Sequence, residues 1–488
     1  MTGKDDLCYL SASEALARFK ARKLSPVELM KALIARAEAV QPKINAFTFT
    51  YFDQALDKAR AAEARYMKTD GRVRPLEGIP FAVKDEAYIK GWPTSSASLI
   101  SKDKIAETTS PEIERMLKAG VIVHARTATP EFSCLGQTWS RRWGVTRNPW
   151  NTDKTPGGSS GGSAASLAAG TTTIASGSDI GGSIRIPASC CGVVGFKAPY
   201  GRIPQDPPFN LDVYCHSGGL ARTVADMALI QNTMAGPHPH DIATIRPKLR
   251  IPPVDSLGSI KGWKVAYSVD LGYAEVDKDV AKNTRDAVAA FKVLGATVEE
   301  VDLGWDLSVL ATAMNHLNHI FGAAIGQNLR EHRYEMTSYA RKWSEAAQLS
   351  TPADFFASLV GAGAMYRTLG PILDAHDVFI CPTTALSAVR ADLDPTKEEV
   401  TINDKPVDSV LGWVLTYPFN VMSRCPVMSV PSGFDREGVP TGIQIVGRTY
   451  DDVRVFRAAA AYERAKPWLS PKARPWIDTS GRKGKARA

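Results

Sequence analysis

Two short segments of the chain combine serine and glycine in a way that could do chemistry. Residues 157–163 read Gly-Gly-Ser-Ser-Gly-Gly-Ser, and residues 179–185 read Asp-Ile-Gly-Gly-Ser-Ile-Arg. Glycine lets the backbone approach another backbone or a ligand closely, although ordering it costs conformational entropy. Such segments predict loops that either present N–H groups to an anion or hold serine hydroxyls in a reactive geometry.

The second segment predicts a nucleophile at Ser183. The backbone N–H groups of Ile180, Gly181 and Gly182 precede it. Preorganised donors of this kind stabilise the oxyanion that forms when a serine attacks a carbonyl group. On its own, the segment is equally consistent with a tight turn that exposes a serine to solvent.

A nucleophilic serine needs a base, and the usual histidine has no recognisable partner pattern in this chain. His124 lies in a strand-like run, His216 lies in a predicted loop, and the other histidines lie in loops or in a variable helical region. Residues 157–161 match the G-x-S-x-G pattern of a nucleophile elbow. That motif requires a strand directly before it, and a polar loop stands there instead.

Lysine is the other candidate base. Residues 79–83 alternate as in a short apolar strand, and Lys84 ends this run. Burial at this position would lower the pKa of the lysine from about 10.4 toward neutrality. The Ser159 hydroxyl could then pass the proton of Ser183 to Lys84, because a hydroxyl donates one hydrogen bond while accepting another. The alternative interpretation is a solvated lysine at the end of a strand.

Three segments, in this order, resemble the amidase signature family of serine hydrolases. Residues 78–85 (Gly-Ile-Pro-Phe-Ala-Val-Lys-Asp) resemble its lysine strand, residues 156–163 its glycine- and serine-rich signature, and residues 177–188 its nucleophile segment. Further matches extend the resemblance over most of the chain outside the central helical region: 143–150, 191–201 and 442–448, within 10–205 and 370–468. One departure is Lys-Ala-Pro-Tyr at 197–200, where the family usually has Lys-Pro-Thr.

The resemblance implies a catalytic triad of Lys84, Ser159 and Ser183, with a cis peptide bond before Ser159. It places the oxyanion hole at the N–H groups of these residues: Ile180, Gly181, Gly182 and Ser183. It also implies that Asp179 and Arg185 pair and brace the nucleophile turn. From the sequence alone, Asp179 and Arg185 could equally be ordinary surface charges.

The resemblance further implies a cofactor-free and metal-free hydrolase that cleaves carboxylic amides through a serine acyl-enzyme. Ser133, Cys134 and Gly136 stand where the family lines its acyl pocket. The helical region 307–369 would form one wall, with these aromatic and sulfur-containing side chains: Met314, Phe321 and Tyr339. Such a pocket would suit apolar or aryl acyl amides, or esters and carbamates of similar shape, although these side chains are also typical of an ordinary core.

Helical patterns alternate with short apolar strands along the chain, which indicates an α/β protein. We find neither an interdomain linker nor an internal repeat. We therefore expect one α/β/α domain over residues 1–470, with a central mixed and twisted sheet covered by helices. Residues 307–369 would be a helical insertion into it, and residues 471–488 a basic tail. The buried strands at 378–382 and 427–431 are each expected to stop at proline.

Composition limits the function classes. The net charge is +8, but residues 466–488 hold seven basic residues and one acidic residue, so the body is nearly neutral and no nucleic-acid site is predicted. None of the seven cysteines forms a C-x-x-C pair, so neither a zinc site nor a disulfide framework is indicated. With no apolar run of about 18 residues and no secretory signal pattern, we expect a cytoplasmic protein that acts on a small-molecule amide as a monomer or homodimer.

Two alternatives remain at this level. One is the glutaminase component of a tRNA-dependent amidotransferase, which would need a docking surface and an acidic glutamine pocket. The other is a binding protein with a catalytically inactive amidase fold, against which the intact Lys84, Ser159 and Ser183 set argues. A phosphate-binding loop is excluded because no G-x-x-x-x-G-K-[ST] pattern occurs.

Overall fold

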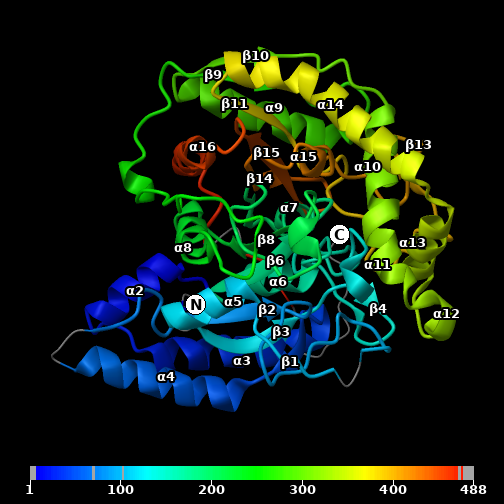
Figure 1. The fold of residues 1–488 in the computed structure, drawn as a ribbon. Helices are drawn as coiled ribbons and strands as arrows, with labels where there is room; N and C mark the ends of the chain where they lie inside the picture. Colours follow the sequence, from blue (N-terminus) through cyan, green and yellow to red (C-terminus); the bar gives the residue numbers. More distant parts are fainter. Residues whose placement is uncertain (1–6, 69–71, 102–103, 471–473, 476, 478–488) are drawn as a thin grey trace.

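The computed structural model describes residues 7–68, 72–101, 104–470, 474–475 and 477. One eleven-stranded sheet runs through its centre (Figure 1). In spatial order the strands are β1 (Phe47–Thr50), β3 (Ile122–Thr127), β2 (Pro80–Lys84), β6 (Ile174–Asp179), β8 (His216–Ala221), β7 (Val194–Lys197), β14 (Val427–Phe434), β15 (Pro440–Val446), β11 (Val378–Pro382), β9 (Lys264–Tyr267) and β10 (Thr297–Glu300). Strand β2 is parallel to β3 and β6, and β9 is parallel to β10 and β11, while the other neighbours are antiparallel. The predicted mixed sheet is therefore confirmed.

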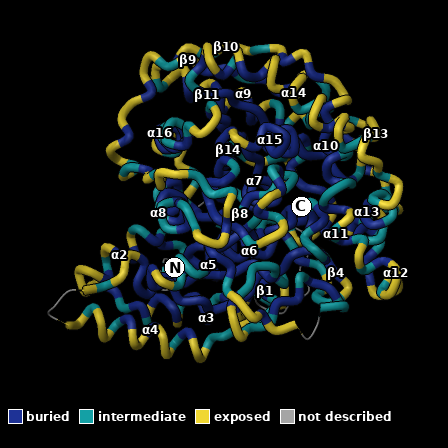
Figure 2. The backbone as a smooth tube through the Cα atoms, viewed as in Figure 1, coloured by how far each residue is buried: buried dark blue, intermediate teal, exposed yellow. Residues whose placement is uncertain are grey.

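Helices cover both faces of this sheet. The helices that contact it most extensively include α6 (Gly161–Ala168), α7 (Arg185–Cys191), α8 (Val224–Met234), α9 (Lys278–Val293) and α16 (Asp452–Ala465). Side chains of β11 alternate between two cores: Val378 and Ile380 pack into one, and Phe379 and Cys381 into the other. Successive strand residues point to opposite faces, so this alternation shows a sheet buried on both sides. Figure 2 shows the same burial along the centre of the molecule.

Further helices surround this centre. Near the N-terminus lie α2 (Ala12–Lys20), α3 (Pro26–Ile44), α4 (Phe52–Met67) and α5 (Pro111–Ala119). The predicted helical region 307–369 contains α10 (Ser308–Leu317), α11 (Ala323–Gly326), α12 (Leu329–His332), α13 (Ser338–Leu349) and most of α14 (Pro352–Ala375), and α15 (Pro418–Val421) follows later. Helix α14 contacts β9 and β11, which joins this region to the sheet. No described helix combines the length and apolar character needed to cross a membrane.

Two small antiparallel ladders lie apart from the main sheet. They are β4 (Trp139–Ser140) with β5 (Gly144–Val145), and β12 (Val400–Ile402) with β13 (Lys405–Val407). Most of the predicted basic tail, including residues 478–488, lies outside the described residues.

Three local predictions were wrong. His216 begins strand β8 rather than lying in a loop. The glycines that suggested a loop, Gly218 and Gly219, are needed in the strand because a Cβ there would approach Ile184 and Ile230 side chains at 3.0 and 2.7 Å. Strand β14 continues past Pro431 to Phe434, and an irregularity in its pairing with β15 at this point accommodates the proline. Residues 191–197 also read as one buried strand in the sequence, but the strand begins only at Val194, because Cys191 ends helix α7.

The small-residue helix α6 packs unusually closely on its surroundings. Every residue of α6 is buried. A Cβ on Gly162 would lie 2.3 Å from the Ala128 nitrogen and 2.5 Å from the Ala46 carbonyl oxygen, and these are backbone atoms that cannot rotate away. The glycine therefore fixes how close the helix can lie to the chain beside it.

We expect Gly162→Ala to lower the free energy of unfolding by about 1–3 kcal/mol, because overpacking forces the backbone to shift. The matched control is Gly363→Ala in α14, where a Cβ would meet nothing within 4 Å. Alanine at that helical position should instead raise the free energy of unfolding by about 0.5–1 kcal/mol. Chemical denaturation of both variants measures the difference, and equal effects would contradict the close-packing argument.

Candidate active site

Lys84 lies at the carboxyl end of strand β2, between β3 and β6 in the sheet, and is 1% exposed. Its backbone N–H donates to Ser176 Oγ at 2.9 Å, which ties this strand end to β6. Its Nζ donates to Ser159 Oγ at 2.7 Å and to Ser178 Oγ at 2.8 Å. The lysine is therefore buried between serine hydroxyls, and the solvated strand-end alternative is wrong.

A carboxylate also contacts this lysine. Glu86 Oε1 lies 3.0 Å from Lys84 Nζ, and the Ser133 hydroxyl donates to the same carboxylate. Burial lowers the pKa of Lys84 below its usual range, while the charge of Glu86 opposes this shift. Burial would raise the pKa of Glu86, but the Lys84 ammonium and hydrogen bonds from Ser133 and Ser178 lower it overall. The balance between burial and Glu86 thus controls how readily Lys84 becomes neutral.

Ser159 sits in a turn that other backbone segments enclose. The peptide bond from Gly158 to Ser159 is cis. A Cβ on Gly158 would lie 2.3 Å from the Gln137 carbonyl oxygen, so only glycine fits there. The Thr138 hydroxyl donates to the Gly157 carbonyl at 2.8 Å, which fixes the start of the turn.

Ser183 follows strand β6, in the turn that leads into helix α7, and is 7% exposed. The Ser160 N–H donates to the Ser183 carbonyl at 3.1 Å, so the two serine-bearing turns are joined directly. No hydrogen bond between the Ser159 and Ser183 hydroxyls is present among the described residues. Catalytic hydrogen bonds are often long in a free enzyme and tighten when substrate binds.

The backbone ahead of Ser183 presents unused donors. Among the described residues, no group accepts a hydrogen bond from the N–H groups of Ile180, Gly181 and Gly182. On the other side of this turn, the Thr416 hydroxyl donates to the Gly181 carbonyl at 2.6 Å. The position of Gly182 is equally constrained, because a Cβ there would lie 1.9 Å from Thr416 Oγ1. The turn is therefore held by its carbonyl groups and leaves its N–H groups available.

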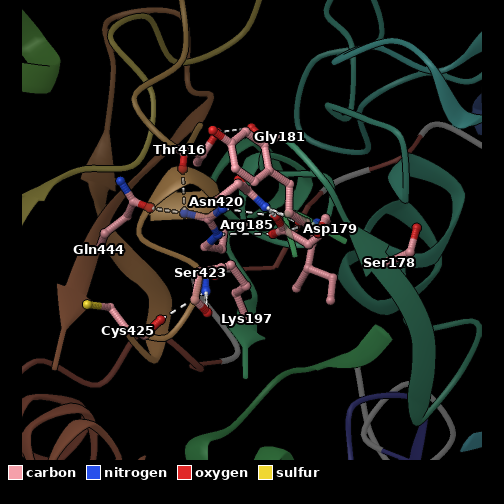
Figure 3. A network of polar contacts seen from close by, with 12 residues as sticks. Ser178, Asp179, Gly181, Arg185, Lys197, Thr416, Asn420, Ser423, Cys425 and Gln444 are labelled. Carbon is pink, nitrogen blue, oxygen red and sulfur yellow. Dashed lines mark hydrogen bonds and ion pairs between the residues drawn. The ribbon is translucent and has the colours of Figure 1, made fainter. Parts of the chain in front are cut away.

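Asp179 and Arg185 form a fully buried ion pair across this turn (Figure 3). Arg185 Nε and Nη2 donate to the two carboxylate oxygens at 3.0 and 2.9 Å. Burial would raise the pKa of Asp179, but the Arg185 guanidinium lowers it well below its usual range. The predicted pair is present, and its surface-charge alternative is wrong.

A cavity of about 300 Å³ opens beside Lys84 and Ser159. Its apolar wall includes Phe132, Ile180, Phe209, Phe321 and Ile325, and its polar wall includes Glu86, Ser133 and Ser178. The volume lies at the lower end of the range of about 300–1,000 Å³ typical of ligand pockets. Ser183 is not among the residues that line it.

The predicted pocket residues are only partly brought to this cavity. Ser133 and Phe321 line it, whereas Cys134, Gly136, Met314 and Tyr339 do not. The Cys134 carbonyl accepts from the Trp343 indole at 2.8 Å, and the Cα of Gly136 faces the Trp413 ring. The Tyr339 hydroxyl contacts the Glu131 N–H and the Trp139 carbonyl, so it belongs to the core.

The sequence did not single out several polar residues that shape the site: Glu86, Ser178, Thr416, Asn420 and Gln444. Glu86 lies only two residues after Lys84, so its proximity was a usable signal. The last three residues come from a segment more than 230 positions after Ser183, and no local pattern marks them.

Comparison with known proteins matches residues 28–456 to the family model described as "Amidase". The chain is 34% identical to an acylamidase of Rhodococcus erythropolis over 96% of this chain and 98% of the relative. It is 33% identical to a component of the glutamyl-tRNA(Gln) amidotransferase of Geobacter metallireducens over 96% and 99% of the two chains. Among solved structures, a bacterial aryl acylamidase of the amidase signature family superposes with a TM-score of 0.87 and 31% identity, covering 94% of this chain and 97% of that one. The chain therefore belongs to the amidase signature family.

Proposed function

We propose that this enzyme hydrolyses carboxylic amides through an acyl-enzyme on Ser183. The observation that carries the proposal is the buried Lys84 Nζ 2.7 Å from Ser159 Oγ, in a turn bonded to the backbone of Ser183. A buried amine has a lowered pKa and can accept a proton once neutral. The similarity to an acylamidase and an aryl acylamidase supports the same reaction.

In the proposed mechanism, Ser183 Oγ attacks the amide carbon while its proton passes through the Ser159 hydroxyl to neutral Lys84. The carbonyl oxygen becomes an oxyanion and receives hydrogen bonds from the N–H groups of Ile180, Gly181, Gly182 and Ser183. Collapse of this intermediate breaks the C–N bond, and the proton returns from Lys84 through Ser159 to the leaving amine. Water then attacks the acyl-enzyme by the same route and releases the carboxylic acid and Ser183.

The substrate class follows from the cavity wall. The helical region 307–369 contributes Phe321 and Ile325 to it, beside Phe132 and Phe209. We propose that this apolar wall favours aryl and alkyl acyl amides. We also propose that residues 1–470 form one catalytic unit, with the helical region as its specificity-determining insertion.

A glutaminase role is the second candidate, because the chain is also similar to an amidotransferase component and the cavity wall includes acidic residues. Hydrolysis of glutamine and copurification with partner proteins would identify that role. An inactive binding protein is the remaining alternative. Labelling of Ser183 by a fluorophosphonate probe would exclude it.

We expect Ser183→Ala to lower kcat/KM for an aryl amide roughly 1,000-fold or more, because no acyl-enzyme can form. Fluorophosphonate labelling should be lost in parallel. The control is Ser189→Ala. Ser189 is also buried but lies in helix α7, and its Oγ is 3.5 Å from Thr384 Oγ1. Near-normal turnover by the Ser183 variant would overturn the assignment of the nucleophile.

Replacing Glu86 should change the pH dependence of the reaction. Activity requires neutral Lys84, so kcat/KM rises as the pH increases through the pKa of Lys84. The Glu86 charge raises that pKa against the effect of burial. We therefore expect Glu86→Gln to move the rising limb of the pH profile to lower pH.

The matched control for this experiment is Glu437→Gln, since Glu437 is half exposed and pairs with Lys154. The control profile should coincide with that of the unmodified enzyme. A limb that stays in place, or moves to higher pH, in the Glu86 variant would contradict the role of Lys84 as the base.

A further inference from the structure

One side of the cavity carries more acidic groups than the proposed mechanism uses. Glu112 and Asp206 line the same cavity as Lys84 and Ser159. Glu112 belongs to the first turn of helix α5, and Asp206 lies in the loop before the short helix Phe209–Leu211. Among the described residues that line the cavity, Lys84 is the only basic one, and Glu86 pairs with it.

Glu112 has a carboxylate oxygen that nothing satisfies. Its residue exposure is 6%, and its Oε2 is buried without a hydrogen-bond partner among the described residues. The nearest cation on its own helix, Arg115, donates instead to these carbonyl groups: Met234, Gly236 and Pro237. Burying a polar group without a partner is costly, so an unsatisfied carboxyl group on a residue that lines a cavity points to a partner that enters the cavity.

Asp206 supplies a second carboxylate on the same side. Its Oδ2 accepts a hydrogen bond from the Ser110 hydroxyl, and Ser110 Oγ in turn accepts the Tyr88 N–H at 2.9 Å. No described cation forms an ion pair with either Asp206 or Glu112. Burial and then the charge of Asp206 raise the pKa of Glu112 to about 8, so Glu112 is largely protonated near neutral pH unless a cation beside it favours the ionised form.

We propose that Glu112 and Asp206 bind a cationic amino group on the substrate, so that the enzyme selects amides with an apolar body and an ammonium end. The proposal rests on the proposed amide hydrolysis and names its substrate class. The ammonium supplies the donors and positive charge that the acidic wall lacks. The apolar side chains of the same cavity, Phe132, Phe209 and Phe321, would receive the apolar body.

The acidic groups could hold the α-ammonium of an amino acid such as glutamine, but the described lining of the cavity offers no partner for its other charged end. Its α-carboxylate would need a cation, and Lys84 is already engaged by Glu86, Ser159 and Ser178. We therefore infer that the preferred substrate carries an ammonium group without a neighbouring carboxylate.

Two isosteric pairs of anilides test this inference. They also show whether the preferred ammonium group lies on the acyl side or on the amine side of the amide bond. In the first pair the acyl group differs, as 5-aminopentanoyl anilide against hexanoyl anilide. In the second pair the amine differs, as the hexanoyl amide of 4-(aminomethyl)aniline against that of 4-ethylaniline. We expect kcat/KM of the ammonium member to exceed that of its neutral partner by about 30-fold or more in at least one pair, as for a buried charged hydrogen bond.

Variants separate this site from the catalytic groups. Glu112→Gln and Asp206→Asn should each lower kcat/KM of the ammonium members far more than that of the neutral members, and so remove most of that preference. The matched control is Glu114→Gln, on the same helix, where the carboxylate is partly exposed and pairs with Lys118. It should keep the full preference.

Calorimetric titration of the Ser183→Ala protein with each pair provides a readout that does not depend on turnover. Tighter binding of an ammonium member, if it is lost in Glu112→Gln, would support the inference. If neither pair were hydrolysed, this result would still stand, and only the proposed hydrolysis would be overturned. Hydrolysis of the neutral members without preference for the ammonium members would overturn the inference and leave the proposed function intact. Equal binding of both members of each pair, or more efficient hydrolysis of glutamine than of any anilide, would also overturn it.

Discussion

The arrangement of the site depends on one buried guanidinium. All five N–H donors of Arg185 are used: two by Asp179, two by the Thr416 carbonyl and Gln444, and one by Asn420. Removing a charge from water costs several kcal/mol, roughly, and is offset only when geometry and hydrogen bonding are nearly complete. This requirement fixes the positions of its partners, and through them the turn that carries Ser183.

Sheet topology explains why Lys84 meets this turn. Strands β2 and β6 are parallel neighbours, so their carboxyl ends lie at the same edge of the sheet. Lys84 ends β2 and Asp179 ends β6. The turn at Ser159 then lies against both, because Gly158 and Gly162 allow contact with backbone at distances that a side chain would forbid. Burial of the lysine, which lowers its pKa, is consistent with the interior place of β2, which pairs with β3 on one side and β6 on the other.

Much of this could be predicted from local sequence, and the remainder could not. The strand before Lys84 and the serine- and glycine-rich turns have a local pattern, whereas the Asp179–Arg185 pair was expected only from the family resemblance. The cavity wall was predicted less well: Tyr339 and Cys134 are core residues, while Glu112 and Asp206 were not anticipated. Which face of a helix or loop borders a cavity depends on tertiary packing, and short-range patterns do not record it.

Arg185 donates hydrogen bonds to residues far along the sequence, and this has a consequence during protein synthesis. Its guanidinium is satisfied only when Gln444 and Asn420 have joined the fold, although the residues of the proposed triad are all made before position 184. A nascent chain on the ribosome would hold Lys84, Ser159 and Ser183 long before their supporting contacts exist. Such an enzyme would acquire its reactivity late, once nearly the whole polypeptide had emerged, and incomplete chains released early would be inert toward cellular amides.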